Sequence, residues 1–483
     1  MSDLSWPLAR AAVVHHDATA VIDGERSVTY AQLADRVAAL AGALDGRTIG
    51  FLGANSLAHV ECWLGVPASG RVLVDLNYRL AVDELAFMVE DAGIELLIAD
   101  DERAPVARRL GVPAVIGDEY ERLVSGPPGK LGGVDENALA AISYTGGTTG
   151  RPKGVMLSHR NLLANALHNL AVTGHAVTDR WLHVCPMFHV AGTSNLLAAT
   201  WVGSTQVVLG RFEPRAVLET IAAQRITHVV FVPTMLALLL EADRGDDLSS
   251  LRHMQYAASP ISPELQARVL ERFDCDVAQF YGMTEAAPTV THLSPADHRE
   301  RPDRLASMGA PIPGVQVEIR DAVDGVGELW IRGPNIMLGY WKRPDATAEA
   351  LVDGWYRTGD LVRADADGYL YMVDRAKDMI ISGGENVYSV EVESVLLSHP
   401  AVSEAAVFGV PDPRWGEAVH AVVVAEGVDA DELAAHCRAR IAGFKVPRAI
   451  ELRSEPLPKS GAGKVLKGRL REPYWAGQER RVS

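Results

Sequence analysis

The chain has 483 residues, of which 48% are hydrophobic and 22% are charged, and its formal net charge is −16. This length exceeds one ordinary core and predicts two or more domains. The acidic charge argues against a nucleic-acid partner and against electrostatic adhesion to anionic membranes. The N-terminus resembles no secretory signal, and no apolar run is long enough to span a bilayer. We therefore expect a cytoplasmic protein without an integral membrane segment.

The four cysteines, Cys62, Cys185, Cys275 and Cys437, are widely scattered and form no CxxC pair. This spacing fits neither a disulfide framework nor a cysteine-based metal site, so we expect reduced structural cysteines. Cys185 precedes Pro186 near a histidine, which makes it a candidate catalytic thiol. However, its neighbours in sequence include no group that would stabilise a thiolate.

Helices alternate with short apolar runs in the first part of the chain. Thr29 and Gln32 form a capping-box pattern that opens an apolar-periodic helix through residue 44. The elements expected next are strands at 48–52, 72–76 and 95–99, and helices near 57–66 and from 82. This alternation is typical of an α/β architecture with largely parallel sheets.

The same pattern extends to about residue 325 and then changes. The later elements of the α/β part are apolar runs at 139–143 and 227–232 and a helix at 235–241. From residue 325 short strands alternate with turns, which indicates a β-rich subdomain. The elements beyond Lys377 are a helix at 390–397, strands at 402–410 and 419–425, and a helix from 430. They predict a compact α+β unit.

One loop, at residues 143–154, has the composition of a polyphosphate-binding segment. Its sequence is SYTGGTTGRPKG. Glycines allow backbone N–H groups to form an anion-binding concavity, threonine hydroxyls add donors, and Lys153 supplies positive charge. It is not a Walker A loop, because Arg151 and Pro152 separate Gly150 from Lys153. For this loop alone, the alternative is a Gly/Thr-rich surface turn.

Five further motifs follow this loop along the chain. They are PMFHVAG at 186–192, QFYGMTE at 279–285, GWYRTGD at 354–360, DRAKDMIISGGENV at 374–387 and LPKSGAGK at 457–464. Together with the loop, they resemble the core motifs of the adenylate-forming enzymes, in that family's order and over almost the whole chain. The family includes acyl- and aryl-CoA synthetases, adenylation domains of nonribosomal peptide synthesis, fatty acyl-AMP ligases and beetle luciferases.

This resemblance implies both a fold and a reaction. The implied fold class is α/β, with a large multi-subdomain N-terminal AMP-binding domain at 1–376, which includes the β-rich subdomain, and a small mobile α+β C-terminal domain at 377–483. In the implied reaction a carboxylate attacks the α-phosphate of Mg-ATP, pyrophosphate leaves, and a thiol captures the acyl adenylate. The cofactors are therefore ATP, Mg²⁺ and coenzyme A. Such chemistry requires positive charge at the α-phosphate and correct placement of two anions.

The resemblance also implies which residues bind the nucleotide. Glu285 matches the magnesium ligand, and Thr145 is a second candidate for the metal. Thr284 is expected at the α-phosphate, Asp360 at the ribose hydroxyls and Arg375 at ribose or phosphate. The full ATP/AMP-binding set is Thr145, Gly146, Gly147, Thr148, Thr149, Gly150, Lys153, Tyr281, Gly282, Met283, Asp360 and Arg375. Gly146 departs from the family's commonest loop, which has serine there, so one hydroxyl donor is missing.

Two lysines receive roles from the resemblance. Lys464 is expected to bridge the carboxylate and the α-phosphate, and it completes a catalytic set of Lys464, Thr284, Glu285 and His189. It lies in a segment, 438–471, that has ten basic and two acidic residues. Lys377 matches the hinge about which the C-terminal domain rotates between the two half-reactions. The alternative for either side chain is a solvated surface lysine.

The implied CoA-binding residues are Gly383, Gly384, Trp415, Phe444 and Lys445. Gly384 matches the position where pantetheine passes toward the adenylate, because a side chain there would block the tunnel. Trp415 and the pair Phe444-Lys445 resemble CoA-contacting positions of aryl-CoA ligases. Trp415 could equally be a packed structural aromatic.

The implied acyl pocket is mostly small and apolar. His189 matches the aromatic or histidine residue that gates the pocket, and PMFHVAG has no acidic residue that could hold an α-ammonium group. The pocket set is His189, Met235, Ala257, Ala258, Gly282 and Ala286. These residues predict an apolar acid, but small side chains can leave room for a chain or for a ring.

The leading interpretation is an acyl-CoA synthetase with a medium- or long-chain fatty acid as substrate. The alternatives are a CoA ligase for an aryl or arylpropenoic acid and an adenylating enzyme that loads a carrier-protein phosphopantetheine. A noncatalytic nucleotide-binding relative is disfavoured, because Lys464, Glu285 and Asp360 are all present. The oligomeric state is left open, with a homodimer as one option.

Overall fold

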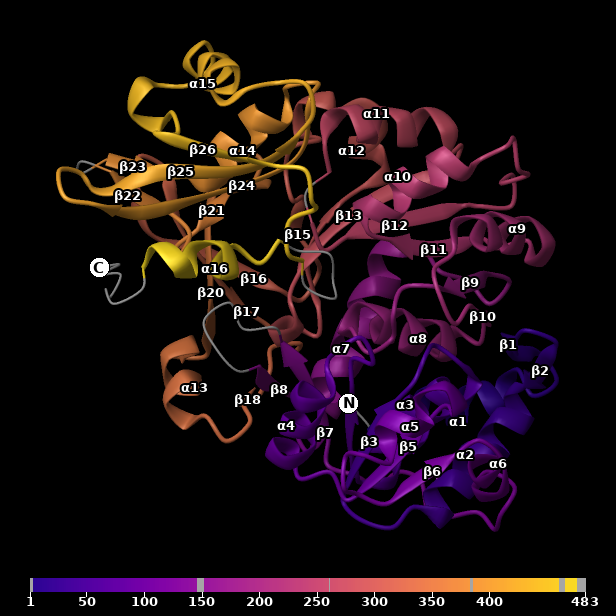
Figure 1. Ribbon diagram of the computed structural model, residues 1–483. Helices are drawn as coiled ribbons and strands as arrows, with labels where there is room; N and C mark the ends of the chain where they lie inside the picture. The colour runs from indigo at the N-terminus through magenta and orange to yellow at the C-terminus, as the bar shows by residue number, and fades with distance from the viewer. Residues whose placement is uncertain (1–2, 146–151, 260, 383–384, 460–464, 476–483) are drawn as a thin grey trace. The chain divides into compact units, whose positions relative to one another are not determined.

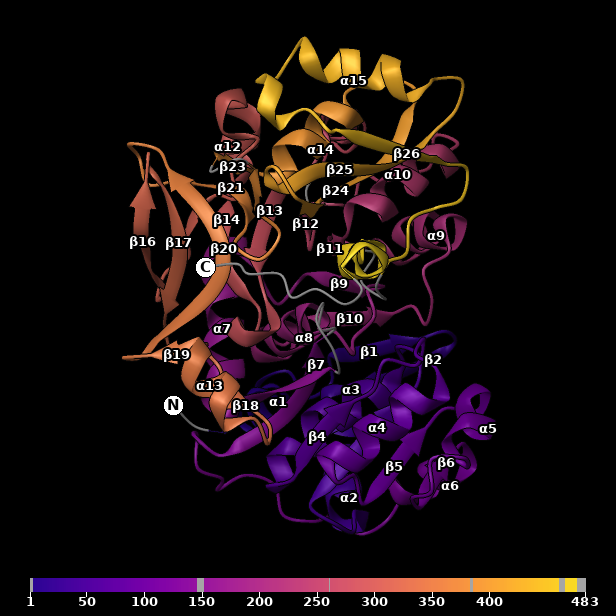
Figure 2. The ribbon, with the colours of Figure 1, turned by 60° about the vertical axis from the view of Figure 1, so that its left-hand side comes forward.

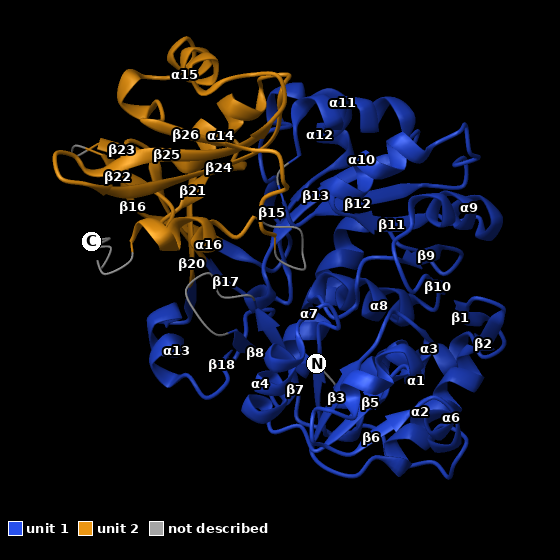
Figure 3. Cartoon of the chain, in the orientation of Figure 1, with its two compact units in different colours: residues 1–145, 152–316, 331–356 blue, residues 146–151, 317–330, 357–483 orange. Residues whose placement is uncertain are grey.

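The computed structural model describes residues 3–145, 152–259, 261–382, 385–459 and 465–475. The chain divides into two compact units (Figure 3). Unit 1 comprises residues 1–145, 152–316 and 331–356, and unit 2 comprises residues 146–151, 317–330 and 357–483. Unit 1 contains two large sheets, and most residues of two smaller sheets belong to unit 2.

The first large sheet of unit 1 has nine strands in the order β15-β14-β13-β12-β11-β9-β10-β1-β2. Neighbours from β13 to β1 are parallel, and β2, β14 and β15 pair antiparallel at the two ends. The bounds are β1 Thr19–Asp23, β2 Arg26–Thr29, β9 Arg180–His183, β10 Thr205–Val208, β11 His228–Phe231, β12 His253–Ala257, β13 Asp276–Gly282, β14 Thr289–Leu293 and β15 Ala310–Pro311. Central strands such as β11 are buried at every residue, as parallel strands covered on both faces require.

The second large sheet has seven strands in the order β18-β8-β7-β4-β3-β5-β6 (Figure 1). The pairs from β7 to β6 are parallel, whereas β8 and β18 pair antiparallel at one edge. The bounds are β3 Thr48–Leu52, β4 Val72–Asp75, β5 Leu96–Ala99, β6 Ala114–Ile116, β7 Leu139–Thr145, β8 Lys153–Ser158 and β18 Gly339–Tyr340. The edge formed by β8 and β18 positions Lys153 and Tyr340.

Helices cover both sheets of unit 1. Figures 1 and 2 place α8 between the two large sheets, and α8 packs against α7. Most of α8 is buried, because nearly all of its side chains are small or apolar. The bounds are α1 Trp6–Val14, α2 Tyr30–Ala43, α3 Leu57–Gly65, α4 Val82–Ala92, α5 Ala104–Ala107, α6 Asp118–Leu123, α7 His159–Thr173, α8 Val190–Val202, α9 Pro214–Gln224, α10 Pro233–Ala242, α11 Pro263–Arg272, α12 Pro295–Glu300 and α13 Pro344–Ala350.

Two smaller sheets contain the remaining strands. One has the order β16-β17-β20-β19, with β21 paired to β20, and the other has the order β23-β22-β25-β24, with β26 paired to β25. The bounds are β16 Gln316–Val323, β17 Val326–Arg332, β19 Leu351–Val352, β20 Trp355–Ala364, β21 Leu370–Arg375, β22 Ile380–Ser382, β23 Glu385–Val387, β24 Val402–Asp412, β25 Gly416–Ala425 and β26 Ala449–Arg453. The helices of unit 2 are α14 Ser389–Leu397, α15 Ala430–Arg438 and α16 Lys467–Arg471.

The elements expected from the sequence are confirmed. Thr29 caps α2 and forms the capping box with Gln32, and β3, α3, β4, α4 and β5 follow in the expected order. The run at 227–232 is β11, and the helix at 235–241 is α10. The strands after residue 325 and the final α+β segment are also present. Among the residues that the structure describes, no helix has the length and apolar character needed to cross a membrane.

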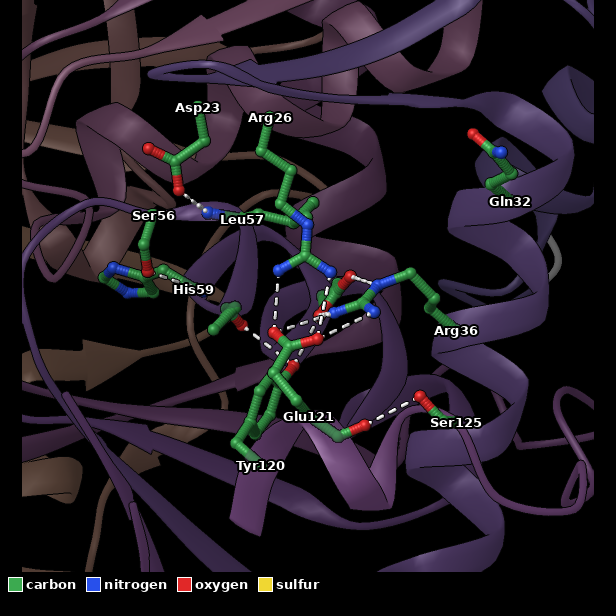
Figure 4. Close-up of polar contacts among 12 residues, drawn as sticks. Asp23, Arg26, Gln32, Arg36, Ser56, Leu57, His59, Tyr120, Glu121 and Ser125 are labelled. Carbon is green, nitrogen blue, oxygen red and sulfur yellow. Dashed lines mark hydrogen bonds and ion pairs between the residues drawn. The ribbon is translucent and has the colours of Figure 1, made fainter. Parts of the chain in front are cut away.

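A partly buried ion cluster joins β2, α2, α3 and α6 in unit 1. Figure 4 shows Arg26 and Arg36 converging on Glu121. Arg36 also forms an ion pair with Glu61, which has no exposed side-chain surface, and the Tyr120 hydroxyl donates to Glu61 Oε2 at 2.7 Å. Burial raises the pKa of Glu61, whereas Arg36 lowers it. Burial is the larger effect, so the pKa of Glu61 stays raised and the guanidinium of Arg36 compensates only in part for a carboxylate that is removed from water.

We expect Arg36→Met to lower the free energy of unfolding by about 3–5 kcal/mol, because the buried Glu61 would lose its cation. The double variant Arg36→Met/Glu61→Leu should recover much of that loss, since it removes both charges. Denaturant unfolding of the single and double variants measures the difference. Equal destabilisation in both variants would show that the cost does not come from the unpaired carboxylate.

Candidate active site

The carboxyl ends of four neighbouring parallel strands, β9, β11, β12 and β13, lie at one edge of the nine-stranded sheet. The register pairs Phe231 with Tyr256 and Ala257 with Phe280, so β11, β12 and β13 end side by side. In open α/β sheets, ligands bind beyond the carboxyl ends of such strands. This edge is therefore the candidate site of unit 1.

The predicted acyl-pocket residues all follow these strand ends. His189 is the N-cap residue of α8 after β9, Met235 lies in the first turn of α10 after β11, and Ala257 ends β12. Ala258 follows with φ +76°, a backbone conformation that side chains other than glycine rarely adopt. Gly282 ends β13, and Ala286 follows it. The fold thus brings the six residues to one edge.

His189 belongs to a row of rings that the sequence analysis did not identify. The centroid of its ring lies 4.5 Å from that of Phe188, and Phe188 meets Tyr78 edge-on at 5.4 Å. The guanidinium of Arg103 lies 4.3 Å from the Tyr78 ring centroid, and that of Arg79 lies 5.6 Å from it. Flat apolar faces and cations therefore adjoin the expected gate residue. Tyr78 and Arg79 follow β4, and no sequence motif marked them as functional.

Gly282 allows a tight turn in the segment that carries Thr284 and Glu285. A Cβ atom at Gly282 would lie 1.9 Å from the Pro288 carbonyl oxygen, so no other residue fits this backbone. The Met283 N–H donates to the same carbonyl at 2.9 Å. Thr284–Ala286 form a single 3₁₀ turn, followed by Ala287 at φ +60°. The segment is therefore compact and has an unusual backbone conformation.

Glu285 and Lys153 are brought together by Tyr340. The Tyr340 hydroxyl donates to Glu285 Oε1 at 2.9 Å, and Lys153 Nζ lies 4.9 Å from the centroid of the Tyr340 ring. Burial and the nearby Glu285 carboxylate raise the pKa of Tyr340, so the phenol stays protonated as a donor. The sequence analysis missed Tyr340. Its only signal was a position in GYW, shortly before the GWYRTGD motif.

This arrangement fits a magnesium polyphosphate. Mg²⁺ in proteins is commonly held by one or two carboxylates together with substrate phosphates, and Glu285 supplies such a carboxylate. Thr145 pairs with Lys153 in the β7–β8 ladder, and its Oγ1 donates to the Lys153 carbonyl at 3.4 Å. Thr145 and Lys153 therefore flank the predicted phosphate loop. Several predicted residues lie outside the described part of the chain: Gly146, Gly147, Thr148, Thr149, Gly150, Gly383, Gly384 and Lys464.

In unit 2, two predicted nucleotide-binding residues are partners across two strands. Asp360 on β20 is paired with Arg375 on β21, and Arg375 Nε lies 3.4 Å from Asp360 Oδ1. Asp360 is only 6% exposed, while Arg375 is more accessible. A carboxylate and a guanidinium side by side provide acceptors for ribose hydroxyls and donors for a phosphate.

Lys377, the predicted hinge residue, lies two positions after Arg375 in the same unit. Burial lowers the pKa of Lys377, and the neighbouring Arg375 contributes in the same direction. Arg471 Nη1 donates to the Lys377 carbonyl at 3.4 Å and lies 3.7 Å from Asp378. The expected hinge residue is therefore partly buried and in contact with α16.

The predicted CoA-binding residues that the structure describes are Trp415 and the pair Phe444 and Lys445, all in unit 2. The guanidiniums of Arg414 and Arg448 lie 4.8 Å and 4.7 Å from the centroid of the Trp415 ring. Phe444 is exposed, whereas Lys445 forms an ion pair with Glu391 at 2.8 Å. Trp415 thus combines an aromatic ring with two cations, which are the kinds of group that contact the base and the phosphates of a nucleotide.

The four cysteines are free thiols, as expected. Burial raises the pKa of Cys185 to about 12. Its Sγ donates to the Val230 carbonyl at 3.3 Å and lies 3.8 Å from the Met235 sulfur. A protonated thiol in this setting is a packing group rather than a nucleophile.

Comparisons with known sequence families agree with this geometry. Residues 8–341 match the family described as AMP-binding enzyme, and residues 391–464 match the AMP-binding enzyme C-terminal domain. The chain is 42% identical to a feruloyl-CoA synthase of Amycolatopsis over 97% of this chain and 98% of that protein. It is 36% identical to a fatty acid–[acyl-carrier-protein] ligase of Streptomyces coeruleorubidus, over 96% of this chain and 95% of that protein.

Solved structures resemble the fold over nearly its full length. The o-succinylbenzoate CoA synthetase of Bacillus subtilis, in complex with its acyl-adenylate intermediate, superimposes with a TM-score of 0.88 at 33% identity, covering 97% of this chain and 98% of that one. The same enzyme in complex with ATP and a magnesium ion has a TM-score of 0.86 at 33% identity, covering 96% of this chain and 99% of that one.

We expect Tyr340→Phe to raise the Kd for Mg-ATP about tenfold, because Glu285 would lose a hydrogen bond worth about 1.5 kcal/mol while the ring beneath Lys153 stays in place. Tyr340→Leu removes both contacts and should weaken binding further. Titration of each variant with Mg-ATP at fixed free Mg²⁺ measures the effect. Wild-type affinity in both variants would exclude Tyr340 from the site.

Proposed function

Because the chain belongs to the AMP-binding enzymes, and is an AMP-forming acid–thiol ligase that uses ATP, Mg²⁺ and CoA, we propose that its substrate is an aryl or arylpropenoic acid. The observation that carries this proposal is the 42% identity to a feruloyl-CoA synthase over almost the whole chain. The o-succinylbenzoate enzyme is likewise named for an aromatic acid. The comparisons therefore favour this substrate class over the fatty acid that the sequence analysis preferred.

The residues at the strand ends are compatible with a flat ring. Ala257 and Ala258 are small and retain exposed surface, so their backbone can approach a planar substrate closely, whereas Ala286 and Ala287 are buried. Phe188 contacts His189, and Tyr78 contacts Phe188, so two further aromatic rings lie near this position. Ring edges and faces attract one another in offset and edge-on arrangements, which a fatty chain cannot use.

We assign residues of this chain to roles in the first half-reaction, which forms the acyl adenylate. A carboxylate oxygen of the acid attacks the α-phosphorus of ATP and pyrophosphate leaves, so negative charge must be balanced around both phosphate groups. Lys153 and Thr145 flank the loop that would bind the β- and γ-phosphates, and Thr284 would contact the α-phosphate. Glu285 would hold Mg²⁺, which would neutralise phosphate charge. Lys464 would bridge the acid and the α-phosphate.

For the second half-reaction the CoA sulfur attacks the acyl carbonyl, the thiol proton is lost and AMP leaves. Asp360 and Arg375 would retain the ribose of the adenylate. We propose that Lys377 is the hinge between an N-terminal domain at 1–376 and a C-terminal domain at 377–483, and that Gly384 lies on the pantetheine path. We also propose a cytoplasmic location, where ATP and CoA are available, and a homodimer.

A carrier protein is the second candidate acceptor, since one relative is named as a fatty acid–[acyl-carrier-protein] ligase. A carrier-bound phosphopantetheine has no adenine nucleotide. The Trp415 ring with Arg414 and Arg448 beside it suits that nucleotide, which favours CoA.

We expect the enzyme to release AMP fastest with arylpropenoic acids, with kcat/KM at least about tenfold above that for fatty acids, because a fitted ring gains binding in the transition state. The assay measures AMP and pyrophosphate with Mg-ATP across ferulic, cinnamic, benzoic and fatty acids, each with and without CoA. Efficient turnover of fatty acids alone would overturn the proposed substrate class. An adenylate that CoA cannot discharge would indicate a carrier-protein acceptor.

We expect Trp415→Ala to raise the KM for CoA about tenfold, because stacking of a base on an aromatic ring contributes about 1–3 kcal/mol. Turnover with pantetheine, which lacks the nucleotide, should not change. Trp415→Phe keeps a ring and should lie close to the wild type. An equal loss with CoA and pantetheine would mean that Trp415 is only a structural aromatic.

A further inference from the structure

A stripe of buried asparagines runs along α7. Asn161, Asn165 and Asn169 are spaced four residues apart and therefore lie on one face of the helix. Their exposed fractions are 5%, 0% and 3%. Fully buried amides are costly unless their donors and acceptors are satisfied, so the partners of these side chains indicate why polar residues are present.

Asn165 holds the backbone that follows Glu285. Its Nδ2 donates to the Thr289 carbonyl at 3.2 Å and to the Ala286 carbonyl at 3.4 Å, and its Oδ1 accepts from Ser194 Oγ at 2.8 Å. The segment 286–289 runs from the last residue of the 3₁₀ turn to the first residue of β14, so sheet pairing does not satisfy all of its carbonyl groups. In this segment, side-chain amides donate the hydrogen bonds that these carbonyl groups need.

Asn335 donates to the same two carbonyls from a distant part of the chain. Its Nδ2 lies 2.7 Å from the Ala286 oxygen and 3.2 Å from the Thr289 oxygen. Asn335 is fully buried, and within the described residues its Oδ1 has no hydrogen-bond partner. An amide whose oxygen stays unsatisfied is favourable at this position only through its N–H donors.

The same stripe also reaches the segment that precedes Tyr340. Asn161 Nδ2 donates to the carbonyls of Pro334 and Ile336 at 2.9 Å and 2.7 Å. The next residue, Met337, donates its N–H to the Glu285 carbonyl at 2.9 Å. The segment 286–289, which follows Glu285, and the segment 334–337, which contacts Glu285, are therefore both hydrogen-bonded to one face of α7.

We propose that Asn165 and Asn335 are positioning residues for adenylate formation. By holding the carbonyls of Ala286 and Thr289, they fix the segment 284–289, which carries Thr284, Glu285 and the predicted acyl-pocket residue Ala286. One pair of amides thus sets the phosphate-binding and acid-binding positions together. This inference rests on the proposed function, because the roles of Thr284 and Glu285 come from it.

The test measures adenylate formation by pyrophosphate exchange in Asn165→Ala, Asn335→Ala and the double variant. We expect each single variant to lower kcat/KM for Mg-ATP about 10–100-fold, since displacement of a reacting group by about 1 Å costs about that much. The Mg²⁺ concentration for half-maximal exchange should rise at least about threefold. Because both amides serve the same two carbonyls, the double variant should lose less than the product of the single losses.

Gln206→Leu is the matched control. Gln206 is an equally buried amide on β10, but its hydrogen bonds go to Thr200 and His183. We expect this variant to lose stability while its Mg²⁺ dependence stays that of the wild type. Circular dichroism at the assay temperature establishes the folded fraction of every variant. If an alanine variant does not fold, the corresponding serine variant replaces it and is judged by the same criteria.

The inference is overturned if folded variants keep kcat/KM within about twofold of the wild type. It is also overturned if the losses multiply in the double variant while the Mg²⁺ dependence stays unchanged, because that pattern describes general destabilisation. Failure of the proposed function would be visible in the wild type itself, as an absence of adenylate formation with every acid of the panel.

Discussion

The parallel pairing of β9, β11, β12 and β13 is the constraint on which the candidate site depends. Parallel neighbours must be joined by crossovers, so the carboxyl ends of all four strands lie at one edge of the sheet. This pairing brings residues that are far apart in sequence, such as His189, Met235 and Glu285, to the same edge. The core that buries these strands therefore determines the site geometry, and Met235 belongs both to this core and to the predicted acyl pocket.

Where the chain leaves the sheet, backbone groups need other partners. The segment after β13 turns so tightly at Gly282 that only glycine fits, and it continues through a residue with positive φ. Such a backbone persists only when its surroundings specify it. Here the donors of Met283, Asn165 and Asn335 bind the carbonyls of this segment. Buried polar groups, which are costly in an apolar core, are concentrated where an irregular loop must keep one conformation.

The cations of the candidate sites also depend on the side chains that surround them. An acidic protein that binds a polyphosphate and CoA needs cations that are not neutralised by carboxylates. Lys153 lies against the Tyr340 ring, and Arg414 and Arg448 lie against Trp415. An aromatic face orients a cation without cancelling its charge, so the cation can still attract an anion. Arg375, in contrast, is paired with Asp360, where the expected ligand includes both hydroxyl groups and a phosphate.

Features that depend on local pattern were predictable from the amino-acid sequence: the Thr29–Gln32 capping box, the alternation of helices and strands, and the six motifs that indicated an AMP-forming ligase. The motif residues that lie outside the described part of the chain, including Lys464, keep their predicted roles as predictions. The contact of Tyr340 with Glu285, and the two carbonyls that Asn165 and Asn335 share, became visible in the folded chain. Those contacts join residues from distant parts of the chain, and neither periodicity nor spacing records which side chains meet once strands pair and helices pack across them.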